Sequence, residues 1–354
     1  MNKLIVIIVS MAFLSCSNMK ESQIEDLVCS GVVLIQNTSY YELIMSNGTS
    51  IFFSSYDEEN GVIGLQTDRD SVEMAKSYGT GFIVSPKGHI ATNAHVVSNM
   101  VSEKDVNKSM SKLFTVLKDV YKEVLRDYKM EKDTVDLLYN IANISDEISY
   151  DTFYKIRDYR EDLNENIEEC EEVISALNDI RISDSELKYH NEVSIAYNDT
   201  YVTSMNDFSS CVITATDMEH DVAILQLKDK CTPKDKYVFS IPEEDPLESY
   251  SFFDNLTTFF DKDKNSRLFM PSFNLGPALA LTDEGVMCQF NSGSISQKTK
   301  DKIMYSIPTL NGSSGSPVVN LKGEIVAINN SGINNTQSFN FGVRIKHLRN
   351  LINE

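Results

Sequence analysis

The sequence is short of positive charge, with 32 lysines and arginines against 52 aspartates and glutamates and a net charge of −20. Binding to nucleic-acid phosphates needs clustered basic residues, so the composition argues against this class of function. It leaves peptide or protein substrates open. Apolar residues make up 42% of the 354 residues, enough for a packed core. The length fits two domains, or one domain with a large insertion.

A hydrophobic run long enough to cross a membrane is missing at the N-terminus, where the apolar stretch covers only residues 4–14. Its position, after one lysine, predicts a secretory signal over residues 1–15. Ser15 followed by Cys16 resembles the cleavage site of bacterial lipoproteins, although Phe13 and Leu14 depart from the usual pattern. This resemblance implies export to the periplasm or cell surface with a lipid anchor on Cys16. A plain signal peptide, leaving a soluble protein, is the alternative.

Paired cysteines are not evident either. Five cysteines remain after Cys16, and an odd number cannot all pair within one chain. Cys211 and Cys231 are close enough in sequence to form a disulfide, but ordinary buried thiols explain them equally well. Their spacings match no metal-ligand pattern, so we expect neither a metal nor another cofactor. The remaining cysteines are Cys29, Cys170 and Cys288.

Residues 101–190 lack both glycine and proline. Apolar residues recur there every three or four positions in two stretches, which predicts two helices broken near the sequence NISDEIS. We expect an antiparallel helical hairpin. The segment holds 13 basic and 22 acidic residues, so it is a solvated acidic surface or, alternatively, a docking surface for a protein partner.

Short β-type runs separated by turn residues flank this segment on both sides, and the C-terminal sequence IKHLRNLINE is helical in character. Many short strands of this kind predict a pair of small β-barrels or a β-sandwich. Periodicity alone does not choose between these two folds.

Histidine is scarce, with five residues, so a catalytic base can be sought by elimination. His95 follows a β-type run and lies in the apolar sequence AHVV. Of the other four, two lie in or at the end of turns, one follows the helical region and one lies in the C-terminal helical sequence. Asp221 stands at the start of the apolar run VAILQL, and a carboxylate entering a buried strand needs a partner. Taken alone, a core histidine and a turn aspartate explain these residues well.

The sequence NGSSGSPVVN at residues 311–320 contains three serines and two glycines. Gly312 and Gly315 permit a tight turn around Ser314, whose N–H could converge with that of Gly312 to form an oxyanion hole. Ser313 would face the opposite way, and Ser316 begins the next strand. As an isolated string of glycine and serine, the loop is an ordinary turn.

The sequences TNAHVV, HDVAIL and GSSGSP each occur once, in the order His, Asp, Ser and each at a predicted strand boundary. Together they resemble the trypsin-like serine proteases, in particular the exported bacterial branch with the high-temperature-requirement proteases and the glutamyl endopeptidases. The resemblance implies that His95 is the general base, that Asp221 orients it and that Ser314 is the nucleophile. Gly312 and Ser314 would supply the oxyanion N–H groups.

The same resemblance implies two antiparallel barrels of the chymotrypsin type. Together with the helical patterns, the expected fold is mainly β, with a long α-helical hairpin insertion and a C-terminal helix. Residues 28–100 and 191–230 would form the N-terminal barrel. Residues 231–354 would form the C-terminal barrel and terminal helix. Residues 101–190 are then an insertion between His95 and Asp221, either a lid or regulator of the site or an inert addition.

The family's substrate-binding positions correspond to Pro308, Thr309, Asn329, Ser331 and Gly332. They include no acidic residue, which argues against cleavage after arginine or lysine, and Asn329 stands where the glutamyl endopeptidases carry histidine. We therefore expect a small or medium apolar residue before the cleaved bond. The competing functions are a catalytically idle, protease-fold lipoprotein that binds partners through its helical insertion, and an esterase, which the serine loop does not resemble.

Overall fold

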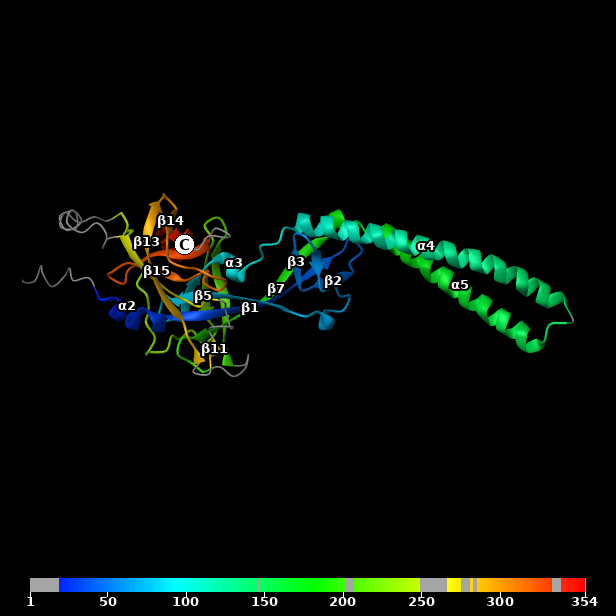
Figure 1. Cartoon of the computed structure of the whole chain (residues 1–354), viewed down its shortest axis with the longest axis horizontal. Helices are drawn as coiled ribbons and strands as arrows, with labels where there is room; N and C mark the ends of the chain where they lie inside the picture. Colours follow the sequence, from blue (N-terminus) through cyan, green and yellow to red (C-terminus); the bar gives the residue numbers. More distant parts are fainter. Residues whose placement is uncertain are drawn as a thin grey trace, which may run out of the picture. The chain divides into compact units, whose positions relative to one another are not determined.

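The computed structural model describes residues 19–145, 147–201, 207–248, 266–274, 281–282, 285–332 and 339–353 (Figure 1). The chain divides into two compact units. The first contains Met1–Ser39, Lys76–Met100 and Asn191–Glu354, and the second contains Tyr40–Ala75 and Val101–His190. None of the helices within the described ranges combines the length and apolar character that a membrane crossing requires.

The first unit contains an antiparallel barrel built from the N-terminal half of the fold. Its strands pair in the order β1-β5-β6-β9-β8-β7, and pairing of β7 with β1 closes the ring. Val33, Ile83, Ile90, Leu225 and other apolar residues fill its interior, as the alternating strand pattern requires. The strands are β1 (Val32–Ile44), β5 (Ala75–Ile83), β6 (His89–Thr92), β7 (Glu186–Tyr197), β8 (Ser209–Asp217) and β9 (Val222–Leu227).

A second closed barrel follows in the same unit, with strand order β10-β13-β14-β17-β16-β15 and closure between Phe269 of β10 and Val319 of β15. Met270, Tyr305 and Val326 are among its fully buried residues. The strands are β10 (Arg267–Ser272), β13 (Gln289–Lys298), β14 (Lys302–Tyr305), β15 (Pro317–Val319), β16 (Ile325–Gly332) and β17 (Asn340–Arg344).

Short elements complete this unit. Apolar residues from both barrels, among them Phe82, Ile224, Phe269 and Val343, join residues of the flanking helices in one buried cluster. The elements are α2 (Glu21–Val28), η1 (Cys29–Gly31), α3 (Ala94–Val97), β11 (Leu281–Thr282), β12 (Gly285–Val286) and the C-terminal helix α8 (Ile345–Asn353). Two antiparallel barrels, a helical insertion and a C-terminal helix confirm the predicted fold class, and the sandwich alternative is not found.

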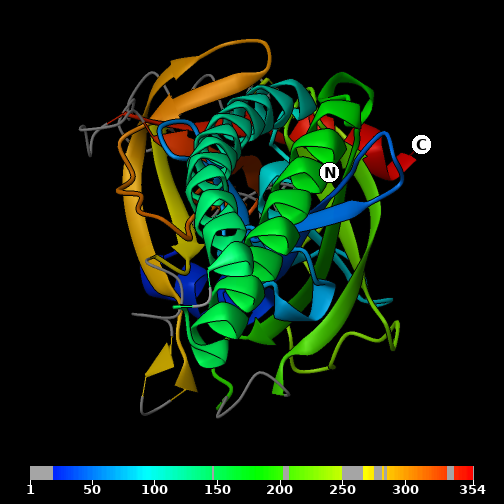
Figure 2. The ribbon, with the colours of Figure 1, turned by 90° about the vertical axis from the view of Figure 1, so that its right-hand side faces the viewer.

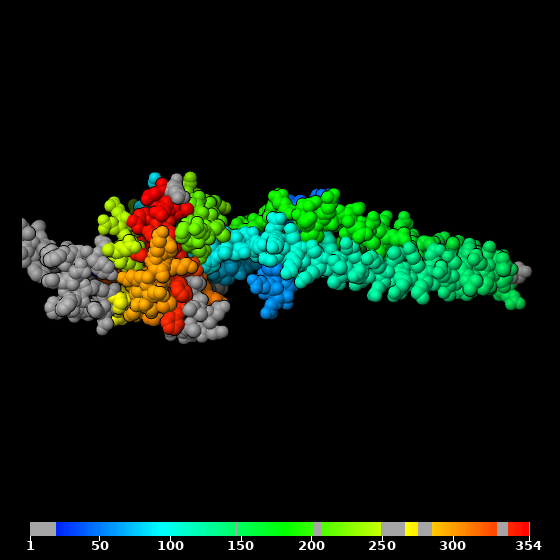
Figure 3. All heavy atoms as spheres, turned by 90° about the horizontal axis from the view of Figure 1, so that it is seen from above, coloured from blue at the N-terminus to red at the C-terminus, as the bar shows by residue number. Residues whose placement is uncertain are grey.

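The second unit is dominated by the helices α4 (Glu103–Ile144) and α5 (Tyr150–Asp179), which lie side by side (Figures 2 and 3). The Ser149 hydroxyl caps α5 by accepting the N–H of Thr152. An ion pair between Lys129 and Glu171 at 2.6 Å joins the two helices. With no glycine or proline to interrupt them, both helices run as the sequence predicts.

Residues 40–75 group with this hairpin, whereas the sequence analysis places them with the first barrel. The reason is an apolar cluster that includes Tyr41 and Phe53 from this segment together with Val106 and Met110 from α4. The segment and the chain after α5 supply β2 (Ser50–Phe53), β3 (Ser55–Asp57), β4 (Gly61–Ile63), η2 (Arg69–Ser71) and η3 (Ile182–Asp184).

Candidate active site

His95 is held at the end of a strand by local structure. Strand β6 ends at Thr92, the extended Asn93 begins a new turn, and His95 lies in the one-turn helix α3. The buried Asn93 side chain donates a hydrogen bond from Nδ2 to the carbonyl oxygen of Asp221 at 2.8 Å. This bond fastens the histidine turn to the start of β9.

His95 and Asp221 are brought together although they are 126 residues apart in sequence. His95 Nδ1 lies 2.7 Å from Asp221 Oδ2, and the N–H of His95 donates to Oδ1 of the same carboxylate at 2.8 Å. Asp221 has a φ of +55°, a left-handed conformation that few side chains tolerate. Because the carboxylate accepts the Nδ1 proton, Nε2 of the imidazole is left as the basic nitrogen.

The three serines of the loop have different surroundings. Ser313 is 2% exposed and its hydroxyl donates to the Leu310 carbonyl oxygen at 2.7 Å. Ser316 is fully buried and donates to the carbonyl oxygen of Ser313, also at 2.7 Å. Ser314 is only half-buried. Of the three hydroxyls, that of Ser314 is therefore the one a substrate can reach.

Strand β5 of the first barrel holds this loop of the second barrel from one side. The N–H of Thr80 donates to the carbonyl oxygen of Ser314 at 2.8 Å, and its hydroxyl donates to that of Gly312 at 2.8 Å. A side chain at Gly315, where φ is +87°, would have its Cβ 2.1 Å from the Thr80 carbonyl oxygen. Thr80 was not singled out from the sequence, because no local pattern marks a contact over 232 residues.

The Ser314 hydroxyl donates to the carbonyl oxygen of Asn330 at 3.2 Å. Within the described residues it forms no hydrogen bond with His95. The N–H groups of Gly312 and Ser314 likewise donate to no acceptor in the described part of the chain, and Gly312 has a φ of +98°. Two N–H groups without an acceptor among the described residues are the kind of donor that an oxyanion hole uses.

Asn329, a predicted substrate-binding residue, is 1% exposed. Its Oδ1 accepts the hydroxyl proton of Tyr305 at 2.6 Å, and its Nδ2 donates to the carbonyl oxygen of Ser313 at 2.8 Å. Complete burial raises the pKa of the Tyr305 phenol well above its usual value, so this hydroxyl stays a donor. The Asn329 side chain thus supports the serine loop from within the second barrel.

The other predicted residues are less enclosed. Pro308 is exposed, and the Thr309 hydroxyl donates to Oδ1 of the buried Asn340 at 2.6 Å. Ser331 and Gly332 end β16, and the Ser331 side chain is not among those the structure describes. Cys16 also lies outside them. The cysteines after it are free thiols, including Cys211 and Cys231.

Residues 170–328 match the family model of the trypsin-like peptidase domain. The match includes Asp221 and Ser314 and begins after His95, which lies on the far side of the helical insertion. No curated protein matches the chain.

Three proteases are among the solved structures that match the chain. The serine endoprotease from Yersinia pestis is 12% identical, with 96% of this chain and 67% of that chain covered and a TM-score of 0.44. A protease from M. tuberculosis in its active form is 12% identical, with 93% and 82% covered and a TM-score of 0.42. The HtrA-type protease AlgW with a tripeptide is 11% identical, with 95% and 63% covered and a TM-score of 0.45.

The family match and the strand topology agree, since each barrel closes with six antiparallel strands. Residues 170–328 are thus similar to the trypsin-like peptidase domain, and the chain folds into two antiparallel barrels of the chymotrypsin type.

Proposed function

We propose that this protein is a serine endopeptidase that hydrolyses peptide bonds through His95, Asp221 and Ser314. The observation that carries the proposal is the double contact of one carboxylate with His95, at its backbone N–H and at Nδ1. This contact fixes both the tautomer and the orientation of the imidazole, which is what a general base beside a serine nucleophile requires.

In the proposed reaction, Nε2 of His95 takes the Ser314 hydroxyl proton as Oγ attacks the carbonyl carbon of the substrate. Asp221 stabilises the imidazolium that forms. The N–H groups of Gly312 and Ser314 donate to the developing oxyanion. The imidazolium then protonates the leaving amine, and water hydrolyses the acyl-enzyme by the same steps in reverse order. The Ser314 hydroxyl must first leave the Asn330 carbonyl oxygen, which it contacts at 3.2 Å.

We further propose that the substrate residue before the cleaved bond is small or medium and apolar. Pro308, Thr309, Ser331 and Gly332 add no negative charge to this region, and Asn329 is engaged inside the barrel. The protein is proposed to be exported from a bacterial cell and anchored to the membrane by a lipid on Cys16, on the strength of its N-terminal sequence alone.

A second candidate is a catalytically idle scaffold that binds a protein partner through the helical insertion. One observation favours it: the Ser314 hydroxyl bonds to a backbone carbonyl rather than to His95. Apo structures of active enzymes also show long or unmade catalytic hydrogen bonds, so the chemistry must be tested directly.

A fluorophosphonate probe, which reacts with activated serines, separates the two candidates. We expect the chain without residues 1–15 to be labelled, the Ser314→Ala variant to be unlabelled, and the matched Ser313→Ala variant to keep its label. Peptide hydrolysis should fall by about 10⁶ in kcat for Ser314→Ala. Labelling that persists in Ser314→Ala refutes the choice of nucleophile, and a folded parent that is not labelled favours the idle scaffold.

A further inference from the structure

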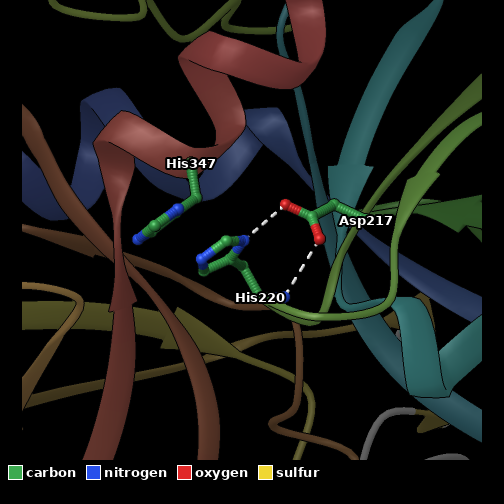
Figure 4. A group of neighbouring side chains, drawn as sticks. All are labelled: Asp217, His220 and His347. Carbon is green, nitrogen blue, oxygen red and sulfur yellow. Dashed lines mark hydrogen bonds and ion pairs between the residues drawn. The ribbon is translucent and has the colours of Figure 1, made fainter.

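A second group of titratable side chains, which the proposed triad does not use, gathers where β8, its following turn and α8 meet (Figure 4). Asp217 is the last residue of β8, His220 lies in the turn before β9, and His347 lies on α8. Each offers one metal-ligating atom, and these three atoms lie within 4.8 Å of one another. They line a surface pocket of about 420 Å³, which gives a ligand access from solvent.

Carboxylates orient both imidazoles. Nδ1 of His220 lies 2.7 Å from Oδ2 of Asp217, and the N–H of His220 donates to Oδ1 at 3.0 Å (Figure 4). Nε2 of His347 lies 3.1 Å from Oδ1 of Asp301, which also pairs with Lys346 at 3.0 Å. For His347, the Asp301 carboxylate on Nε2 fixes the tautomer and leaves Nδ1 as the ligand atom, as in the outer shell of many metal sites. For His220, Nδ1 and the Asp217 carboxylate are themselves the neighbouring ligand atoms.

The two rings stack with their centroids 3.8 Å apart and their planes 18° apart. Transition metals bind a ring nitrogen of imidazole. The two rings are close together and each is held by a carboxylate, so two imidazole ligands lie within reach of one ion.

We propose that Asp217, His220 and His347 form a binding site for one divalent transition-metal ion of the Zn²⁺ type, with solvent completing its coordination. Two imidazole nitrogens and one carboxylate oxygen are a ligand set that Zn²⁺ takes with an open fourth position. The ion replaces the proton held between His220 and Asp217, and that proton is released to solvent.

Binding requires small movements. Ligand bonds of about 2.0–2.2 Å in a tetrahedron separate the ligand atoms by roughly 3.3 Å. The His220–Asp217 pair must therefore widen from 2.7 Å, the third ligand atom must approach, and the rings must tilt out of their stack. Because His220 directly precedes Asp221, the bound ion ties the turn that carries the triad carboxylate to the C-terminal helix.

Calorimetric titration with ZnCl₂ tests the site, using the chain without residues 1–15 and without a histidine tag. We expect one ion per chain. His220→Gln and His347→Gln should each weaken binding at least tenfold, while His89→Gln, on a histidine outside the cluster, should bind like the parent. At a hundredfold excess over Kd the melting temperature of the parent should rise by about 5 °C.

Absence of saturable Zn²⁺ binding by the parent overturns the proposal, and so does unchanged affinity in the His220→Gln variant. His347 is 6% exposed, so its variant is checked for folding by circular dichroism. If that variant does not fold, Zn²⁺ binding by the parent and by the His220→Gln variant, whose residue is only half-buried, decides the result. The experiment measures metal binding rather than hydrolysis, so its result does not depend on the proposed protease activity.

Discussion

Replacing Thr80 with valine removes one hydroxyl that bridges the two barrels. That hydroxyl donates to the carbonyl oxygen of Gly312 at 2.8 Å and accepts the N–H of Phe273 at 3.0 Å. Thr80 is fully buried, and valine has nearly its shape, so the change leaves two backbone groups without partners and creates no cavity. An unpaired buried polar group costs about 1–3 kcal/mol. We therefore expect Thr80→Val to lower the free energy of unfolding by about 2–4 kcal/mol.

Urea unfolding followed by tyrosine fluorescence measures this loss, because the chain contains 16 tyrosines and no tryptophan. The matched control is Thr38→Val. The Thr38 hydroxyl makes an exposed hydrogen bond of 3.3 Å to the Glu192 carbonyl oxygen, so we expect this change to alter stability by less than about 0.5 kcal/mol. Thr80→Val should also slow fluorophosphonate labelling, since the loop around Ser314 loses one of its supports. Equal stability and equal labelling in the two variants would refute the assignment of Thr80 as the residue that positions the serine loop.

Three further predictions follow from buried groups and from the insertion. Asn329→Ala should destabilise the fold by about 2–4 kcal/mol and slow labelling of the serine, because the Tyr305 hydroxyl and the Ser313 carbonyl lose their partner. Urea unfolding and probe kinetics measure these two effects, and an unchanged midpoint of urea unfolding would contradict the prediction. Burial raises the pKa of Cys211 to about 12, so at pH 8 its thiolate fraction is about 10³-fold below that of an ordinary thiol. Maleimide should therefore label the exposed Cys231 first, as read by mass spectrometry, and equal labelling rates of the two cysteines would contradict this. Replacing residues 103–179 by a short linker should leave both barrels folded and labelled by the probe, because neither barrel takes a strand from that range; loss of labelling with retained folding would assign the hairpin a role at the site.

Features that depend on residues close together in the chain could be predicted from the sequence. His95, Asp221 and Ser314 each stand at a strand boundary with its own turn chemistry, and the lack of glycine and proline in residues 101–190 marks the helices. The choice of Ser314 among three serines rests on alternation around Gly312 and Gly315, and the burial of Ser313 and Ser316 agrees with it.

Features that depend on contacts between distant segments were not predictable. Nothing around Thr80 signals that its hydroxyl reaches a loop 232 residues away. Asn329 occupies a position that suggests substrate contact, yet burial in the barrel turns its amide inward to Ser313. Residues 40–75 contain β-type runs like those of the barrel, and their packing in one cluster with Val106 and Met110 of α4 accompanies their grouping with the second unit.

In the chain, α4 and α5 lie between β6, which precedes His95, and β9, which follows Asp221. This position has a consequence for folding kinetics. His95 and Asp221 must find each other across 126 residues, and the entropy lost in closing a disordered loop grows with its length. Helical hairpins form from local contacts, faster than long-range strand pairs. Val106 near the start of α4 and Ile182 just after α5 belong to one cluster, so the folded hairpin brings the ends of the insertion together. A hairpin that folds first thus shortens the disordered loop between His95 and Asp221, and it lowers the entropy lost when the first barrel closes.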